Sequence, residues 1–143
     1  MKGVTAFLMV FLLAACASVP TEAGDPSLAE GGTEATLRTG ATQYRAGATA
    51  ELILTNTFSE QIGYNLCSAA LERNRNGSWA AVDPEGRVCT LELRILEPGA
   101  TTTYRWDLPA NLAPGEYRFR TTIHEMVGQA TRVVTSNSFQ VTG

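Results

Sequence analysis

From Glu34 onward, the hydrophobic and polar residues of this chain alternate with a period of two. No ten-residue window has apolar residues every three or four positions, as an amphipathic helix would. The alternation is clearest at residues 117–124, where one set of side chains is expected inward and the other outward: Tyr117, Phe119, Thr121 and Ile123 against Arg118, Arg120, Thr122 and His124. The pattern predicts β-strands that each bury one face.

Turn residues every eight to twelve positions divide this pattern into short strands. Asn76-Gly77 lies between two alternating runs and predicts a hairpin, because both residue types tolerate positive φ. Trp106 alternates with Tyr104 and Leu108 and is expected in the core. All-β chains punctuated in this way form sandwiches, so we predict an antiparallel β-sandwich of about seven strands.

Two of the expected strands make specific predictions about side-chain direction. Residues 89–96 should form a strand whose inward side chains are Leu91, Leu93 and Ile95. Residues 131–141 should form the last strand, in which Thr135–Ser138 holds a β-bulge. The side chains expected to share the inward face of that strand are Val133, Phe139 and Val141.

The first fifteen residues have the layout of a secretory signal, because Lys2 precedes an apolar run that ends in small residues. That run of about a dozen residues is too short to cross a ~30 Å bilayer core as a helix. Leu13-Ala14-Ala15-Cys16 resembles the bacterial lipobox. The resemblance implies that residues 1–15 are a lipoprotein signal peptide and that Cys16 carries lipid.

Residues 16–33 are predicted to be the lipidated N-terminus and a flexible tether, followed by one domain at 34–143. The segment 17–32 has two prolines, three glycines and no aromatic residue, so it cannot bury enough apolar surface to fold. A coil of this length spans roughly 20–25 Å. Ala17 stands where lipoproteins retained at the inner membrane of two-membrane bacteria have aspartate. By that resemblance the chain is expected at the outer membrane of such a bacterium. The resemblance does not say whether it lies on the periplasmic or the surface side.

Charge and cysteine content exclude several function classes. The net charge of −3 becomes −4 once Lys2, the only lysine, is removed, so the chain has no overall basic charge that would recruit nucleic acid. With Cys16 modified, Cys67 and Cys89 form an even pair, which in an exported protein predicts a disulfide. The single histidine, His124, has no evident nucleophile or metal-ligand partners. We therefore expect no metal, no cofactor and no catalytic centre.

Two Pro-Gly corners carry a resemblance to bacterial immunoglobulin-like domains: Leu96-Glu97-Pro98-Gly99 and Leu112-Ala113-Pro114-Gly115-Glu116-Tyr117. Upstream, further segments are similar to the same domains: Leu54-Thr55-Asn56, Leu71-Glu72-Arg73 and Gly77-Ser78-Trp79. The likeness covers residues 49–141 and implies an immunoglobulin-like sandwich that serves as a binding or structural module.

The resemblance also assigns roles to particular residues. Pro114, Gly115 and Tyr117 are the expected fold-determining corner, at which the tyrosine hydroxyl reaches upstream backbone. Phe119 stands where many immunoglobulin domains have a cysteine, so the usual inter-sheet disulfide is absent. A Cys67–Cys89 bond would instead tie a middle strand to the strand after the Asn76-Gly77 hairpin.

Two functions stay open at this point. The first is a lipid-anchored module that binds a protein of the cell envelope through a sheet edge, a face or loops. Its candidate partner face is Arg118, Arg120 and Arg132, although a solvated sheet face with Glu116 and Thr122 between the arginines is the favoured explanation of these residues. The second is a proteinase inhibitor, because the order of Pro-Gly, Tyr and Trp also resembles the BsuPI-type inhibitors. An inhibitor would need a rigid exposed loop, at Asp83–Val88 or Pro109–Gly115.

Overall fold

The computed structural model describes residues 35–143. The predicted signal peptide at 1–15, the lipid site at Cys16 and the tether at 16–33 lie outside the described residues and stay predictions.

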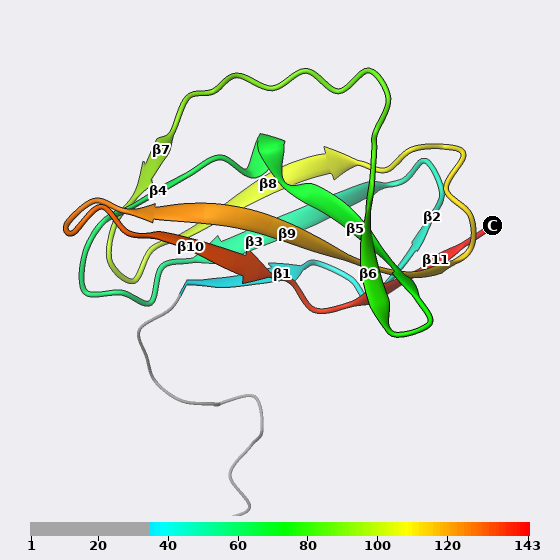
Figure 1. Ribbon diagram of the computed structural model, residues 1–143, viewed down its shortest axis with the longest axis horizontal. Helices are drawn as coiled ribbons and strands as arrows, with labels where there is room; N and C mark the ends of the chain where they lie inside the picture. Colours follow the sequence, from blue (N-terminus) through cyan, green and yellow to red (C-terminus); the bar gives the residue numbers. More distant parts are fainter. Residues whose placement is uncertain (1–34) are drawn as a thin grey trace, which may run out of the picture. The chain divides into compact units, whose positions relative to one another are not determined.

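Two sheets pack face to face in the described part of the chain (Figure 1). The first is three-stranded, in the order β1-β3-β8, and its members are β1 (Thr36–Thr39), β3 (Thr49–Thr55) and β8 (Thr101–Asp107). The second contains β2 (Gln43–Arg45), β4 (Ile62–Tyr64), β5 (Ala70–Arg75), β6 (Ser78–Val82), β7 (Arg94–Leu96), β9 (Gly115–Glu125), β10 (Thr131–Thr135) and β11 (Phe139–Thr142). The 3₁₀ turn η2 (Leu66–Ser68) lies between β4 and β5. The predicted all-β sandwich is confirmed.

β9 is the longest strand and the centre of the larger sheet. It pairs antiparallel with four partners, β10 and β11 on the C-terminal side of the chain and β4 and β5 on the N-terminal side. Its side chains expected inward are all buried: Tyr117, Phe119, Thr121 and Ile123. Across the core, the Phe119 ring meets the Trp106 ring of β8 with centroids 5.0 Å apart. This contact joins the two sheets.

The predicted bulge lies between β10 and β11. Thr135 is opposite Arg120 and Phe139 is opposite Tyr117, so three residues of the last strand face two residues of β9. One extra residue reverses which side chains point inward. The prediction that Val133 lies in the core is therefore wrong. Val133 is 52% exposed, whereas Phe139 beyond the bulge is 1% exposed.

A similar mismatch interrupts the strand on the other side of β9. Tyr64 is opposite Ile123 and Ala70 is opposite Arg120, so five residues of the chain span the two that separate these positions on β9. The surplus residues form the turn η2, which the Asn65 side chain caps by accepting a hydrogen bond from the Cys67 N–H at 3.1 Å. The chain therefore leaves the sheet at η2 and carries Cys67 with it.

The expected strand at 89–96 is largely wrong. Only Arg94–Leu96 forms a strand, β7, and within it only Leu96 is buried. The three leucine and isoleucine side chains expected inward are all exposed: Leu91, Leu93 and Ile95. Side chains do alternate along this segment, but the even-numbered Leu96 is the one that points into the core. The odd-numbered side chains of Leu91, Leu93 and Ile95 therefore lie on the outer side.

Asn56, from the Leu-Thr-Asn segment, is a buried polar residue with a structural task. Its Nδ2 donates to the carbonyl oxygens of Glu60 at 2.8 Å and Leu96 at 3.0 Å, and its Oδ1 accepts from the Phe58 N–H at 3.0 Å. A buried amide with these partners is satisfied and fixes the chains that it joins. It therefore secures the buried end of β7 to the end of β3.

Tyr117 forms the corner at the start of β9. Its hydroxyl donates to the Ala113 carbonyl oxygen at 2.7 Å while its ring is buried. Gly115 precedes it with φ of +155°, and a Cβ there would lie 3.2 Å from Arg73 Nε. The Arg73 guanidinium donates to the Pro114 carbonyl at 2.9 Å, so glycine permits this close approach.

We expect Tyr117→Phe to lower the free energy of unfolding by about 1 kcal/mol, because it removes the hydroxyl and leaves the Ala113 carbonyl without this donor. Urea unfolding measures the change. Tyr44→Phe is the matched control, since that hydroxyl only accepts from the exposed Ala41 N–H. Equal losses in the two variants would contradict a stabilising role for the corner.

Candidate functional site

Residues 83–93 connect β6 to β7 as an arch that projects from the sandwich (Figure 1). We call these residues the arch. After the Glu85-Gly86 turn the chain continues through Leu93 without a further turn or bend. Val88 is 91% exposed and Leu91 is 98% exposed. The domain therefore leaves both side chains almost fully accessible to a partner.

The predicted disulfide is confirmed and attaches the arch to η2. Cys67 and Cys89 are bonded, with 5.7 Å between their Cα atoms. Asn65 Nδ2 donates to the Thr90 carbonyl at 2.6 Å, beside the disulfide. The bond joins η2 to the arch rather than two strands within the sheet, which corrects the sequence expectation. Residues 89–93, between this bond and β7, do not pair with a strand of the described domain.

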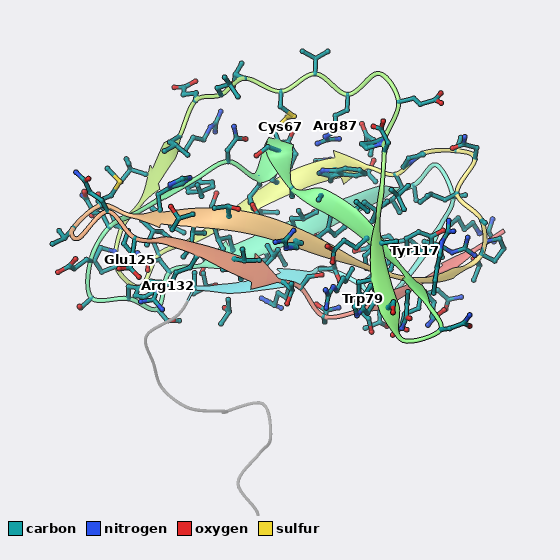
Figure 2. All side chains as sticks on the ribbon, in the orientation of Figure 1. Cys67, Trp79, Arg87, Tyr117, Glu125 and Arg132 are labelled. Atoms are coloured by element: carbon teal, nitrogen blue, oxygen red, sulfur yellow. A yellow bond between two sulfur atoms is a disulfide. The ribbon has the colours of Figure 1, made fainter. Side chains whose placement is uncertain are left out.

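Arg87 is a second attachment, and sequence reasoning missed it. Its Nε donates to the Cys67 carbonyl at 3.0 Å, and its guanidinium lies 4.0 Å from the centroid of the Trp106 ring. Figure 2 shows Arg87 beside Cys67 beneath the arch. Burial lowers the pKa of the Arg87 guanidinium, and the neighbouring Tyr104 and Asp107 side chains oppose that shift. Arginine stays protonated nevertheless, so the contact is a cation–π interaction in a partly desolvated place.

The far end of the arch continues into a small apolar patch on the outer face of the larger sheet. Gly63 of β4 is opposite Ile95 of β7, and a Cβ on Gly63 would lie 3.4 Å from Met126 Sδ and 3.5 Å from Leu93 Cδ1. Leu93 and Met126 thus cover the glycine, yet Leu93, Ile95 and Met126 all stay exposed. Leu93, Ile95 and Met126 therefore form a small exposed apolar patch next to the end of the arch.

The polar side chains of the same segment lie on its other side. Glu92 and Arg94 line a groove of about 250 Å³ between the arch and β8, together with Thr102 and Tyr104. Leu91, Leu93 and Ile95 do not line this groove, whereas Val88 does, so aliphatic and charged side chains lie on opposite sides only over residues 91–95. No strand of residues 35–143 pairs with the outer edge of β7.

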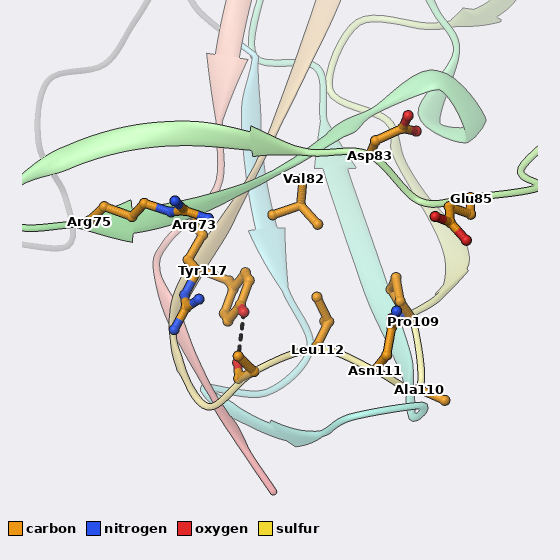
Figure 3. A pocket seen from close by; sticks show the side chains of 11 residues that line it. Arg73, Arg75, Val82, Asp83, Glu85, Pro109, Ala110, Asn111, Leu112 and Tyr117 are labelled. Carbon is orange, nitrogen blue, oxygen red and sulfur yellow. Dashed lines mark hydrogen bonds between the residues drawn. The ribbon is translucent and has the colours of Figure 1, made fainter.

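A second groove, of about 500 Å³, lies between the β5–β6 hairpin and the turn at 109–113. Figure 3 shows Arg73 and Arg75 on one side of it and Asp83 and Glu85 on the other. Arg73 is already hydrogen-bonded to the Pro114 carbonyl, and its guanidinium lies 5.8 Å from the Tyr117 ring centroid. Arg73 in this groove therefore stabilises the corner formed by Pro114, Gly115 and Tyr117.

Two of the three predicted partner-face arginines have acidic partners within the domain. Arg118 Nε lies 2.8 Å from Glu72 Oε2, and its guanidinium covers the Trp79 ring at 4.2 Å. Arg132 pairs with Glu125, as Figure 2 shows, and lies over the Phe58 ring. Arg120 is exposed. A basic face made of these residues stays a prediction.

Within residues 35–143, no cluster of three or more histidine, cysteine or acidic side chains could hold a metal ion. Among the same residues we find no helix long and apolar enough to cross a membrane.

A family model described as a bacterial Ig-like domain matches residues 31–140 of the chain. A search of the curated proteins found no match. Among solved structures, a ceramidase complexed with C2 is similar at 14% identity and a TM-score of 0.47, over 78% of this chain and 19% of that chain. A neutral ceramidase from Pseudomonas aeruginosa is similar at 13% identity and a TM-score of 0.46, over 76% of this chain and 19% of that one. This chain therefore spans only about a fifth of their length, and the likeness carries nothing about what it binds.

Proposed function

The chain belongs to the bacterial Ig-like domain family, and from that premise we propose that it is a non-catalytic binding module of the cell envelope. The observation that carries this proposal is the arch, in which Val88 and Leu91 are almost fully exposed although the segment is attached to the domain at both Arg87 and Cys89. Exposed apolar side chains on a restrained segment are suited to binding a protein.

Restraint matters because binding must offset the entropy of ordering the surfaces that meet. A free eleven-residue loop would lose backbone freedom on binding, at roughly 1–2 kcal/mol per residue fixed. The disulfide, the Arg87 contacts and the Asn65 hydrogen bond restrict the arch beforehand. More of the free energy of apolar contact is then left for affinity.

The proposed anchor is lipid on Cys16, with residues 16–33 as the tether. Two or more acyl chains give stable membrane attachment, whereas one chain gives only marginal binding. A tether of roughly 20–25 Å would hold the domain close to the membrane surface, where its partners would also lie. In a two-membrane bacterium we assign the chain to the outer membrane on the strength of Ala17.

Metabolic labelling of cells with a palmitate analogue should label the chain, and Cys16→Ala should abolish the label and release the domain from the membrane fraction. Cys67→Ala is the matched control, since it removes a different cysteine and should leave the label in place. An unlabelled wild-type chain, or label that persists in Cys16→Ala, would refute the anchor.

A photo-crosslinking residue at Val88 should give defined protein adducts in cells, because that side chain is 91% exposed on the arch. The same residue at Arg38, an exposed position on β1, should give none. Equal adducts at both positions, or none at Val88, would contradict the binding surface. Adducts with a protease, accompanied by inhibition at micromolar concentration, would instead favour the alternative of a proteinase inhibitor whose loop includes Asp83–Val88.

A further inference from the structure

We propose that the free edge of β7, extended by residues 91–93 of the arch, binds the same edge of a second copy of this chain. The inference rests on the proposed function, because it names a partner for the same surface. Three observations carry it: the open edge, the row of aliphatic side chains, and a charge pattern that is complementary to itself.

The open edge provides the main-chain groups. β7 pairs with β4 on one side, and no strand of the described domain pairs with its other side. An edge of this kind recruits another strand unless charge, proline or a cover prevents it. Residues 91–93 precede β7 without a turn, so they can extend the pairing to the five residues Leu91–Ile95.

Two-fold symmetry then limits the possible registers. Two copies related by an axis perpendicular to the sheet keep the same face on the same side, so each residue lies opposite one of its own parity. Centring the pair on Glu92 or on Arg94 would place like charges directly opposite, which is unfavourable. Centring it on Leu93 places Glu92 of each copy opposite Arg94 of the other.

The same register also matches the apolar side chains. With Leu93 on the axis, Leu91 of one copy lies opposite Ile95 of the other, and the two Leu93 side chains lie opposite each other. Six aliphatic side chains that are exposed in the single chain would form a continuous row on the outer face. Cross-strand aliphatic pairs and opposite-charge pairs both stabilise antiparallel strands. The segment Leu91-Glu92-Leu93-Arg94-Ile95 is therefore complementary to its own reverse.

Met126 supports this choice of face. Its side chain lies beside Leu93 over Gly63, so it extends the aliphatic row inward onto the sheet of each copy. Glu92 and Arg94 would remain on the opposite side, facing the groove along β8. The charged pairs and the aliphatic row thus occupy separate faces of the proposed joint sheet.

The register is tested by disulfide trapping of the full chain in detergent micelles with a mild oxidant. Directly opposite residues of antiparallel strands have Cα atoms about 4.5–5.5 Å apart, within the reach of a disulfide. Leu93→Cys should therefore give a covalent dimer on a non-reducing gel. Leu91→Cys is the matched control, because its copy would lie about 13 Å away along the strands. A monomer from Leu93→Cys, or equal yields from both variants, would overturn the proposal.

The charge pattern is tested by reversal in the Leu93→Cys background. Glu92→Arg puts arginines opposite each other twice, and Arg94→Glu does the same with glutamates, so each should lower the dimer yield about tenfold. Mixing the two differently tagged variants pairs arginine with glutamate at every contact and should restore a dimer that carries both tags. Unchanged yields in the single variants, or no mixed dimer, would overturn the proposed register.

The outcome is separable from that of the proposed function. Heterologous adducts from Val88 together with a strictly monomeric Leu93→Cys chain would overturn the self-association and leave the binding module intact. If Leu93→Cys gives a dimer and the residue at Val88 crosslinks to no other protein, self-association is supported. The proposed binding of another protein through the arch is then rejected.

Discussion

The uninterrupted course of β9 is the constraint on which the rest of this structure depends. Its eleven residues pair with four strands and supply the inward side chains Tyr117, Phe119, Thr121 and Ile123. Because β9 has no bulge of its own, each neighbour with surplus residues must turn them out of the sheet. The last strand does so between β10 and β11, and the strand on the opposite side does so at η2.

The excursion at η2 leads directly to the candidate binding surface. It places Cys67 outside the sheet, where it is bonded to Cys89 of the arch, and the chain after the arch pairs with β4 only at β7. A loop of this size contributes about 3 kcal/mol of stability in the chain-entropy account of disulfides. Arg87 adds a cation–π contact with Trp106, of about 1–2 kcal/mol when partly desolvated. The core residue Trp106 thus helps to position an exposed segment.

Much of the fold could be predicted from the sequence, because period-two alternation and turn residues report directly on strands that bury one face. The alternation of Tyr117, Phe119, Thr121 and Ile123 and the Asn76-Gly77 hairpin are examples. Three features could not be predicted. The bulge at Thr135–Ser138 was expected but its register was not, and because the bulge reverses parity, Val133 was expected in the core by the same spacing that correctly placed Phe139. Alternation also says nothing about whether a second sheet covers a face, so Leu91, Leu93 and Ile95 were expected inward. Arg87 carries no local signal at all, since its partners Cys67 and Trp106 are distant in sequence.

The central claim is that the arch is held in place before any partner binds, and backbone order parameters from ¹⁵N relaxation test it most directly. In the disulfide-bonded protein, residues 88–93 should have values near 0.85, like the adjoining strands. After reduction, or in Cys67→Ser with Cys89→Ser, the same residues should fall below about 0.6 while β9 is unchanged. Values below about 0.6 in the oxidised protein would contradict the account, because the arch would then be mobile despite its attachments.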